Sequence, residues 1–594
     1  MKILTIVLLL LNLGILAQPS PNYWQQKADY TLDVNFDVKK HQYKGKQEIV
    51  YSNQSPDTLQ KVFFHLYFNA FQPGSEMDIR SLTIQDADKR VGDRISKLKP
   101  SEIGFLEIEN LKLNGETLQF ETKGTIVEVN LKKPILPNAT AVFKLNFEGQ
   151  VPIQIRRSGR DNKEGIAYSM TQWFPKIAGY DERGWHANPY IGREFFSPFG
   201  NYDVKINIDS NYLIGGTGVL QNPENTKENS TRTWRFKAEG IHDFAWAADT
   251  DYIHDTLTFG QNQKLHFFYQ NDPKIIENWK KLQPIAIKLM NFYQEHIGPY
   301  PYPQYSIIQG GDGGMEYAMC TLITGERKFE SLVGVTAHEM AHAWFQHIIA
   351  TDEANHEWMD EGFTTYISTL AENYVSGKEK ELPWASSYDG YRQLVESAAE
   401  QPQSTHADRY KYNYAYGISA YSKGAIFLSQ LEALIGEKAL KHTLKRYYNS
   451  WKFKHPKPND FIRIAEKESG LELDWYLQDW TTTTNTIDYA IEAVEQQKKS
   501  TTITLVRKGI MPAPVSVAIS YTNKTKETYY VPLRLMRGAR PMKVKEQLLP
   551  DWAWAYPTYT FEIPTKNRKI KEVRLNSSGK IADVDPKNDV FVVK

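Results

Sequence analysis

Alternating apolar and polar positions mark the first part of the chain as β structure. Between about residues 30 and 250, apolar residues recur at every second position, as in Leu32, Val34 and Phe36. Clusters of Asn, Gly, Pro and Asp separate these runs. A period of two is typical of strands that bury one face. We therefore expect a large N-terminal β-sheet domain over residues 18–253.

A helical period replaces this alternation near residue 254. One further strand is expected at about residues 265–269, before a helical segment over residues 274–296 in which Pro284 is expected to cause a kink. Further helical segments are predicted at about residues 330–349, 358–375, 420–434 and 437–451. These patterns predict a mixed, mainly helical domain over residues 254–485.

Alternation returns from about residue 487 onwards. Val515, Val517, Ile519 and Tyr521 share one face of a predicted strand. We therefore expect a small β-sandwich-like domain over residues 486–594. Because 594 residues are too many for one hydrophobic core, the expected fold class is multidomain α+β.

Composition and the first residues limit the partners and the location. The formal net charge is +1 and no long basic run occurs, so nothing indicates nucleic acid binding. An apolar stretch over residues 3–16 follows Lys2, and a polar stretch follows Ala17. This arrangement predicts a signal peptide over residues 1–17, and hence an exported protein, periplasmic or secreted, without stable membrane insertion after cleavage. The alternative is an uncleaved N-terminal anchor.

The clearest chemical signal is a pair of histidines four residues apart, in the segment His338-Glu339-Met340-Ala341-His342. On an α-helix this spacing places both imidazoles on one face, one turn apart, where they can hold one ion. Glu339 lies about 100° round the helix from His338, so its carboxylate is expected to face the cleft instead of the ion.

A catalytic zinc takes three protein ligands and leaves one position for water, so a third ligand is needed. Glu361 supplies it, because it follows His342 after eighteen residues and lies on the first turn of the next predicted helix. We therefore expect one Zn²⁺ per chain, held by His338, His342 and Glu361. Zinc acidifies its bound water and polarises a carbonyl oxygen, and Glu339 is expected to take the proton of that water as general base. The predicted reaction class is hydrolysis of an amide.

Two further motifs stand before and after the histidine pair. Glu316 ends the run Gly313–Glu316, 22 residues before His338, and Tyr421 begins the run Tyr421–Gly424, 60 residues after Glu361. Together these motifs resemble the M1 family of zinc metallo-aminopeptidases, a gluzincin family that includes aminopeptidase N and leukotriene A4 hydrolase. The resemblance covers nearly the whole mature chain. It implies a saddle-like N-terminal β domain, a thermolysin-like catalytic domain and a small C-terminal β domain.

The resemblance also implies roles for individual residues. Glu316 would bind the free α-ammonium of a peptide through a charge-assisted hydrogen bond. Tyr421 would donate a hydrogen bond to the oxyanion of the tetrahedral intermediate. The other substrate-binding residues that it implies are Gly313, Gly314, Met315, Gln172 and Tyr416.

The sequence departs from the family pattern at some positions. Tyr317 stands where most members have asparagine, and Phe174 occupies a usual acidic or amide position, which leaves Gln172 as the contact near the amine. The helical C-terminal domain of most members is also missing from this sequence. Either the cleft is more open, or a second copy of the protein closes it, so the oligomeric state stays undecided.

The function predicted is a zinc-dependent aminopeptidase that removes N-terminal residues from peptides with a free N-terminus. A thermolysin-like endopeptidase is the nearest alternative, and Glu316 argues against it. A catalytically silent scaffold would need none of the metal ligands. A glycan-binding role for the Trp- and Tyr-rich C-terminal domain is a further alternative.

Overall fold

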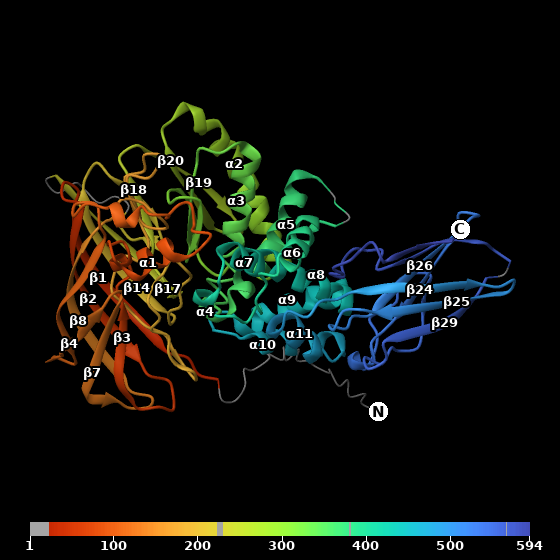
Figure 1. Cartoon of the computed structure of the whole chain (residues 1–594). Helices are drawn as coiled ribbons and strands as arrows, with labels where there is room; N and C mark the ends of the chain where they lie inside the picture. The colour runs from red at the N-terminus through yellow and green to blue at the C-terminus, as the bar shows by residue number, and fades with distance from the viewer. Residues whose placement is uncertain (1–22, 223–229, 379, 381, 566, 594) are drawn as a thin grey trace, which may run out of the picture.

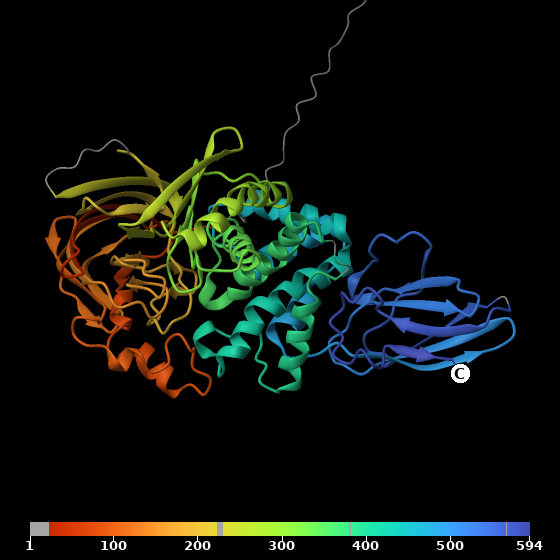
Figure 2. The same ribbon diagram turned by 90° about the horizontal axis from the view of Figure 1, so that it is seen from above.

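The β and helical parts of the molecule follow one another along its length (Figure 1). The computed structural model describes residues 23–222, 230–378, 380, 382–565 and 567–593, so the predicted signal peptide lies outside the described residues. Strands from the first part of the chain form one end, helices the middle, and the C-terminal strands the other end, as the view from above also shows (Figure 2). This arrangement confirms the predicted α+β fold class.

A long mixed sheet forms much of the N-terminal β domain. In spatial order its strands are β16 (Val219–Leu220), β17 (Thr231–Ile241), β14 (Gly200–Asp209), β1 (Lys27–Asp37), β2 (Gln42–Ser52), β8 (Thr140–Gln150), β4 (Phe105–Leu113) and β5 (Glu116–Thr117). Leu32, Val34 and Phe36 of β1 are buried and the residues between them are exposed. The alternation in the sequence therefore predicted which face of β1 enters the core.

Smaller sheets complete this domain. One contains β15 (Leu213–Gly216), β18 (Trp246–Asp249), β10 (Tyr168–Met170) and β9 (Gly159–Arg160); another contains β11 (Lys176–Ile177), β3 (Leu59–His65), β7 (Ile126–Ile135) and β6 (Glu121–Lys123); a third pairs β12 (Tyr180–Asp181) with β13 (Gly184–Trp185). The short helices are η1 (Tyr67–Ala70), α1 (Glu76–Thr83) and η2 (Ile95–Lys97). Loops of this domain reach the mainly helical domain, which is called the catalytic domain below after the role expected from the sequence, and form one wall of the candidate site.

The catalytic domain combines a sheet with a group of helices. In spatial order its strands are β19 (Tyr252–Phe259), β20 (Gln263–Gln270), β21 (Gln304–Gln309), β23 (Cys320–Ile323) and β22 (Gly314–Tyr317). The helices are α2 (Pro273–His296), α3 (Phe329–Ala341), α4 (Glu353–Glu357), α5 (Phe363–Ser376), α6 (Ala385–Glu396), η4 (Ala407–Arg409), α7 (Asn413–Gly417), α8 (Gly424–Ile435), α9 (Glu437–Trp451), α10 (Pro458–Ser469) and α11 (Asp474–Thr482). The helix α2 continues through Pro284.

Some helix limits differ from the sequence expectation. The helix α3 ends at Ala341 and not near residue 349, because the chain then turns and Phe345 forms a short bridge with Ile349. The prediction failed here because these turn residues are buried and apolar, like a helix face. The helices α6, α10 and α11 were not predicted, although Pro458 begins α10 and Gly470 ends it in a left-handed conformation.

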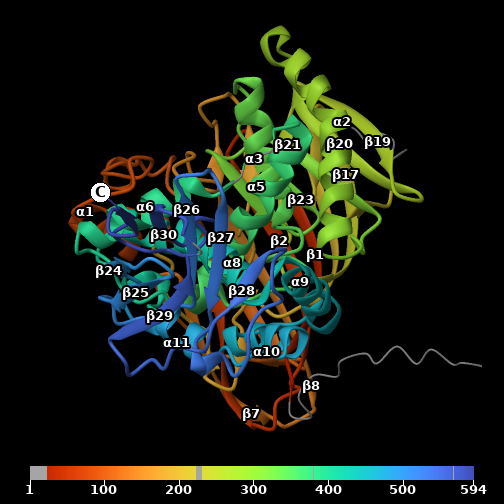
Figure 3. The same ribbon diagram turned by 90° about the vertical axis from the view of Figure 1, so that its right-hand side faces the viewer.

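Two sheets pack into the C-terminal domain (Figure 3). One contains β24 (Tyr489–Gln496), β25 (Ser500–Arg507) and β29 (Thr558–Pro564); the other contains β28 (Glu546–Leu548), β27 (Lys526–Val531), β26 (Val515–Tyr521), β30 (Ile570–Leu575) and β31 (Val590–Val592), with η6 (Arg534–Met536) beside them. The predicted buried face of β26 is confirmed. The domain is joined to the helices by Ala582 N–H, which donates to Gln430 Oε1 at 2.8 Å, and by Tyr388 OH, which donates to Lys580 O at 2.7 Å.

The first described residues bridge the β domain and the catalytic domain. His455 N–H donates to the Tyr23 hydroxyl at 2.9 Å, and Gln25 Nε2 donates to Phe453 O at 3.0 Å. These contacts fix the start of the described chain to the end of α9 and the loop after it. Among the described residues, none of the helices combines the length and apolar character needed to cross a bilayer.

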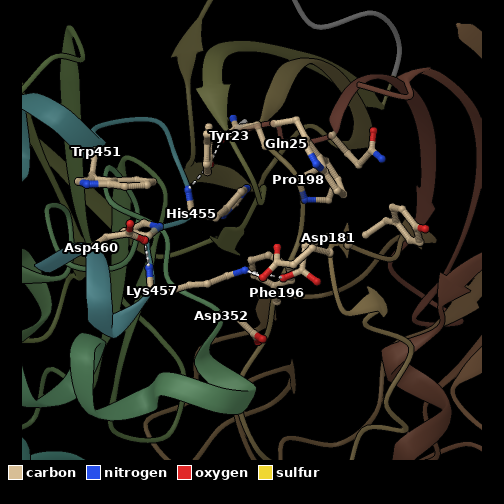
Figure 4. Close-up of a pocket in the computed structure, with 16 residues that line it drawn as sticks. Tyr23, Gln25, Asp181, Phe196, Pro198, Asp352, Trp451, His455, Lys457 and Asp460 are labelled. Carbon is tan, nitrogen blue, oxygen red and sulfur yellow. Dashed lines mark hydrogen bonds and ion pairs between the residues drawn. The ribbon is translucent and has the colours of Figure 1, made fainter. Parts of the chain in front are cut away.

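A cavity of about 360 Å³ lies beside this bridge, between the two domains (Figure 4). Asp181 and Asp352 line it from opposite domains, and the His186 imidazole joins them at 3.0 and 3.3 Å. Burial lowers the pKa of His186, but the two carboxylates outweigh this effect and raise the pKa to about 10. The resulting buried ion network holds the two domains together and so fixes the walls of the candidate site.

Candidate metal centre

The helix α3 places the histidine pair. His338 and Glu339 lie on its last turn, and His342 directly follows its end with helical backbone angles, φ −59° and ψ −18°. The helical geometry therefore continues just far enough to put the imidazole of His342 one turn from that of His338. The early end of α3 leaves the predicted spacing intact.

The imidazoles and Glu361 bring their donor atoms into a triangle. His338 Nε2 and His342 Nε2 are 3.1 Å apart, and Glu361 Oε2 lies 3.2 Å from each of them. Tetrahedral zinc with bonds of about 2.0–2.1 Å separates its ligand atoms by about 3.3 Å. The distances and the donor types thus fit a zinc ion at the centre of this triangle.

His342 is held in the orientation that such a site needs. Its Nδ1–H donates to Asp360 Oδ1 at 2.5 Å, which leaves the lone pair of Nε2 directed at the triangle. Burial lowers the pKa of His342, but the charges of Asp360, Glu316 and Glu361 outweigh this effect and raise the pKa well above its usual range. This surplus of carboxylates around the imidazoles creates a negative site that favours a cation.

Wide π-helical turns carry Glu361 and Tyr421. The turn η3 (Trp358–Gly362) precedes α5, and the turn η5 (Ile418–Lys423) precedes α8. They touch through glycines, since a Cβ atom added to Gly362 would lie 2.4 Å from Gly424 Cα. This close contact brings Tyr421 OH near enough to donate a hydrogen bond to Glu361 Oε1.

A buried lysine holds the Tyr421–Gly424 run in position. Lys423 is fully buried, forms an ion pair with Glu400 at 2.8 Å and lies over the ring of Trp480 at 5.0 Å. A buried lysine is tolerated because a carboxylate and an aromatic face replace its water. The lysine and glycine of the motif thus position η5, and the tyrosine faces the site.

Glu339 is buried beside the ligand triangle. A Cβ atom added to Gly314 would lie 2.1 Å from Glu339 Oε1, so only glycine lets β22 approach this carboxylate. Within the described part of the chain, Oε2 of Glu339 is buried without a hydrogen-bond partner. Burial raises the pKa of Glu339 well above its usual range, and the charge of Glu316 raises it further. An unpartnered, buried carboxylate of this kind is suited to accepting a proton.

The glycine-rich loop before β22 positions Glu316. Gly311 has φ +69°, its N–H donates to Ser169 Oγ at 2.9 Å, and its carbonyl accepts a bond from Asn162 Nδ2 at 2.8 Å. The β domain therefore holds this loop. Burial raises the pKa of the Glu316 carboxyl above its usual range, while the Arg157 charge opposes this shift.

A cavity of about 540 Å³ joins these groups to the β domain. It is lined by Asp86, Ala87, Asp88, Lys89, Arg90, Arg156, Arg157, Arg193, Glu194, Gly314, Met315, Glu316, His338, Glu339, His342, Glu361, Asn413, Tyr414, Tyr416, Gly417 and Tyr421. The residues that the β domain contributes to this lining were not predicted from the sequence. They come from loops without a recognisable motif, so only the folded arrangement reveals them.

Tyr416 lies in this cavity, but Gln172 does not. Tyr416 OH donates to Glu194 Oε1 at 3.1 Å, and the same carboxylate pairs with Arg157. Gln172 instead donates to Asp243 and accepts a bond from Lys176 at 3.2 Å, inside the β domain. Gln172 therefore contacts a buried ion pair and not the cavity. Glu194 lines the cavity from the β domain, as do Asp86 and Asp88.

The structure also places Phe174 and Tyr317, the two residues that depart from the family pattern. Phe174 is fully buried and packs edge-on against Tyr30. Tyr317 is buried, paired with Cys320 across β22 and β23. Neither side chain lines the cavity, whereas Gly314 and Met315 do. Gly313 stands just outside the lining, next to Arg90.

Two imidazoles from one helix and a carboxylate from the next helical segment form a donor set that some zinc hydrolases use. Residues 283–480 match the model described as the peptidase family M1 domain. The similarity to the peptidase family M1 domain therefore lies within the mainly helical domain of this chain.

Curated relatives agree with this similarity. Aminopeptidase M1-C of Oryza sativa subsp. japonica is 26% identical over 216 residues, which are 33% of this chain and 24% of the relative. Aminopeptidase N of Streptomyces lividans is 27% identical over 331 residues, 49% of this chain and 37% of the relative. The chain thus spans well under two thirds of the length of these relatives.

Solved structures extend the similarity to the fold of most of the chain. An M1 zinc metallopeptidase from Deinococcus radiodurans has a TM-score of 0.52 at 15% identity, and the match covers 77% of this chain and 93% of that one. A mutant two-domain M1 zinc metallopeptidase bound to L-tryptophan has a TM-score of 0.54 at 16% identity, and the match covers 78% of this chain and 96% of that one. At such low identity the likeness concerns the fold alone.

Proposed function

We propose that this protein is a zinc aminopeptidase that removes N-terminal residues from peptides. The observation that carries the proposal is the convergence of His338, His342 and Glu361 within 3.2 Å of one another, beside the buried carboxylates Glu339 and Glu316. One Zn²⁺ per chain would be held by the first three residues. Zinc bound there supplies Lewis acidity, which acidifies water and polarises a carbonyl oxygen.

The remaining residues divide the work of peptide hydrolysis. Glu316 binds the substrate ammonium, so a chain that continued past this point would meet its carboxylate. Glu339 accepts the proton of the attacking water and passes it to the leaving amine. The Tyr421 hydroxyl donates to the developing oxyanion. Asp360 keeps the His342 imidazole in place throughout.

Substrates with free and blocked ends test the proposal. The protein is expected to hydrolyse a panel of aminoacyl arylamides, to leave their N-acetylated forms intact, and to lose activity with a zinc chelator. The variant Glu316→Ala should raise KM and weaken the discrimination against acetylated substrates by about 10-fold or more, because a charge-assisted bond to the ammonium is lost. Equal cleavage of free and acetylated substrates by the wild type would instead indicate an endopeptidase.

The variant Tyr421→Phe tests the proposed oxyanion donor. Its kcat should fall by about 10²–10³-fold with little change in KM, because the hydroxyl acts in the transition state. Steady-state kinetics on one arylamide, with zinc content measured in parallel, give the result. Tyr559→Phe is a matched control, since that hydroxyl donates to Pro550 O at 2.8 Å in the C-terminal domain, outside the cavity lining. A raised KM with intact kcat would assign Tyr421 to substrate binding instead.

We also propose export of the protein, on the basis of the signal peptide predicted at residues 1–17. Fractionation of the native host and N-terminal sequencing of the mature protein test this proposal. A mature chain that starts after Ala17 is expected. Retention of residues 1–17 in a membrane fraction would favour the N-terminal anchor.

A further inference from the structure

Arg156 differs from the other arginines of the active-site cavity because its guanidinium makes no hydrogen bond within the part of the chain that the structure describes. Arg156 lines the cavity, and its side chain is 11% exposed. Among the described residues its guanidinium has one charged neighbour, with Nε 3.6 Å from Asp88 Oδ2, beyond hydrogen-bonding distance. The Nη groups of Arg156 are therefore available to a ligand inside the cavity.

The other guanidinium groups of this wall are already engaged. Arg157 forms a buried ion pair with Glu194. Arg193 donates to Asn413 Oδ1 at 2.7 Å and lies over the Tyr416 ring at 4.2 Å. Their charges serve the packing of the β domain against α7, so a ligand would have to displace existing partners to reach them.

Asp88 and Arg90 form a hydrogen-bonded pair next to Arg156, which is called the support below. Arg90 makes paired hydrogen bonds to Asp88, Nε to Oδ1 at 3.1 Å and Nη2 to Oδ2 at 2.8 Å. Arg90 Nη1 also lies 3.9 Å from Asp312 Oδ1, in the glycine-rich loop that leads to Glu316. Asp88 thus directs its hydrogen bonds to Arg90 and leaves those of Arg156 unused. The support connects Arg156 to the loop that carries the ammonium-binding residue.

The two walls of the cavity differ in charge. Glu316, Glu339 and Glu361 line the wall formed by the catalytic domain. The wall formed by the β domain mixes both signs, with cations in excess: it contains Lys89, Arg90, Arg156, Arg157 and Arg193 beside Asp86, Asp88 and Glu194. Carboxylates are the natural partners of an arginine with a free planar fork of donors. A cavity of about 540 Å³ is large enough to enclose a small ligand that spans both walls.

We propose that Arg156 binds a substrate carboxylate, so that the preferred substrates are small peptides carrying both a free ammonium and a nearby carboxylate. This inference rests on the proposed aminopeptidase function. The carboxylate has two sources: the side chain of an acidic first residue, or the C-terminus of a dipeptide or tripeptide. Both present the same group to the guanidinium.

Matched substrate pairs test the proposal and distinguish these sources. One pair is the Glu and Gln arylamides; the other is Ala-Ala and its C-terminal amide. In Arg156→Gln, the ratio of kcat/KM between the carboxylate and neutral members should fall by roughly 10–100-fold for the responsive pair, because a charge-assisted bond is lost. Arg156→Lys keeps the charge and should recover part of the ratio, and it also serves if the Gln variant does not fold.

The control is Lys97→Gln, which removes a positive charge from an exposed position in η2 of the β domain, outside the cavity lining. It should leave both ratios within about 2-fold, because exposed charges are screened. Unchanged ratios for both pairs in Arg156→Gln and Arg156→Lys would overturn the proposal, as would an equal loss for charged and neutral members. Turnover of the neutral arylamide by the wild type tests the aminopeptidase function separately. Should that turnover be absent, calorimetric binding of Ala-Ala and its amide to the wild type and to Arg156→Gln still decides the role of Arg156.

Discussion

Replacing Glu339 by glutamine is expected to lower kcat for an aminoacyl arylamide by about 10²–10⁴-fold while zinc stays bound. The amide has the shape of the carboxylate but cannot accept a proton. Because Glu339 lies beside the His338–His342–Glu361 triangle and is not part of it, the donor set for the ion is unchanged. Glu339 Oε1 lies against the backbone of Gly314, so an isosteric side chain can occupy the same space.

Steady-state kinetics and elemental analysis on the same preparation measure this effect. Glu330→Gln is a suitable control, since Glu330 is an exposed carboxylate on the first turn of the same helix. It should leave kcat within about 2-fold of wild type, as expected for a surface substitution. If Glu339→Gln keeps full zinc content and loses less than tenfold in kcat, another group must accept the proton.

Replacing His342 by alanine is expected to abolish zinc binding and, with it, all measurable hydrolysis. His342 provides one corner of the ligand triangle, and its Nδ1–H is also the partner of the buried Asp360. The substitution leaves two donors for the metal and an unpaired buried carboxylate. Zinc content after dialysis should fall below about a tenth of that of the wild type, as direct elemental analysis can show.

The matched control for His342→Ala is His442→Ala, because His442 is a half-exposed histidine on α9 near Glu468. This variant should keep its zinc and its activity. A His342→Ala protein that is folded and still carries full zinc would show that the ion lies elsewhere. Circular dichroism of both variants separates loss of the metal from loss of the fold.

The sequence predicted those parts of the site that depend on local geometry. His338 and His342 were placed correctly relative to each other because helical spacing alone sets their separation. Even the early end of α3 did not disturb this, since His342 keeps helical backbone angles. Glu361 could be proposed from its position on the next helix, although the π-helical turn that carries it has no sequence signal.

The β-domain wall could not be predicted in the same way. Glu194 and Arg156 lie on loops, and their positions in the cavity depend on how two domains pack. Gln172 was assigned by resemblance, yet its side chain serves the buried pair of Lys176 and Asp243. Contacts between distant segments decide which of these polar side chains reach the cavity, and no spacing rule encodes such contacts.

The contact between Gly362 and Gly424 couples parts of the chemistry that sequence places 60 residues apart. One segment carries Glu361, the proposed ligand of the ion, and the other carries Tyr421, whose hydroxyl donates to Glu361. Because no side chain separates Gly362 from Gly424, neither of the two helical segments can shift or rotate without displacing the other. A change in the position of the Glu361 carboxylate would therefore also change the position of the Tyr421 hydroxyl. Natural or laboratory selection for altered metal preference in this protein must alter both helices in concert, or act on the imidazoles alone.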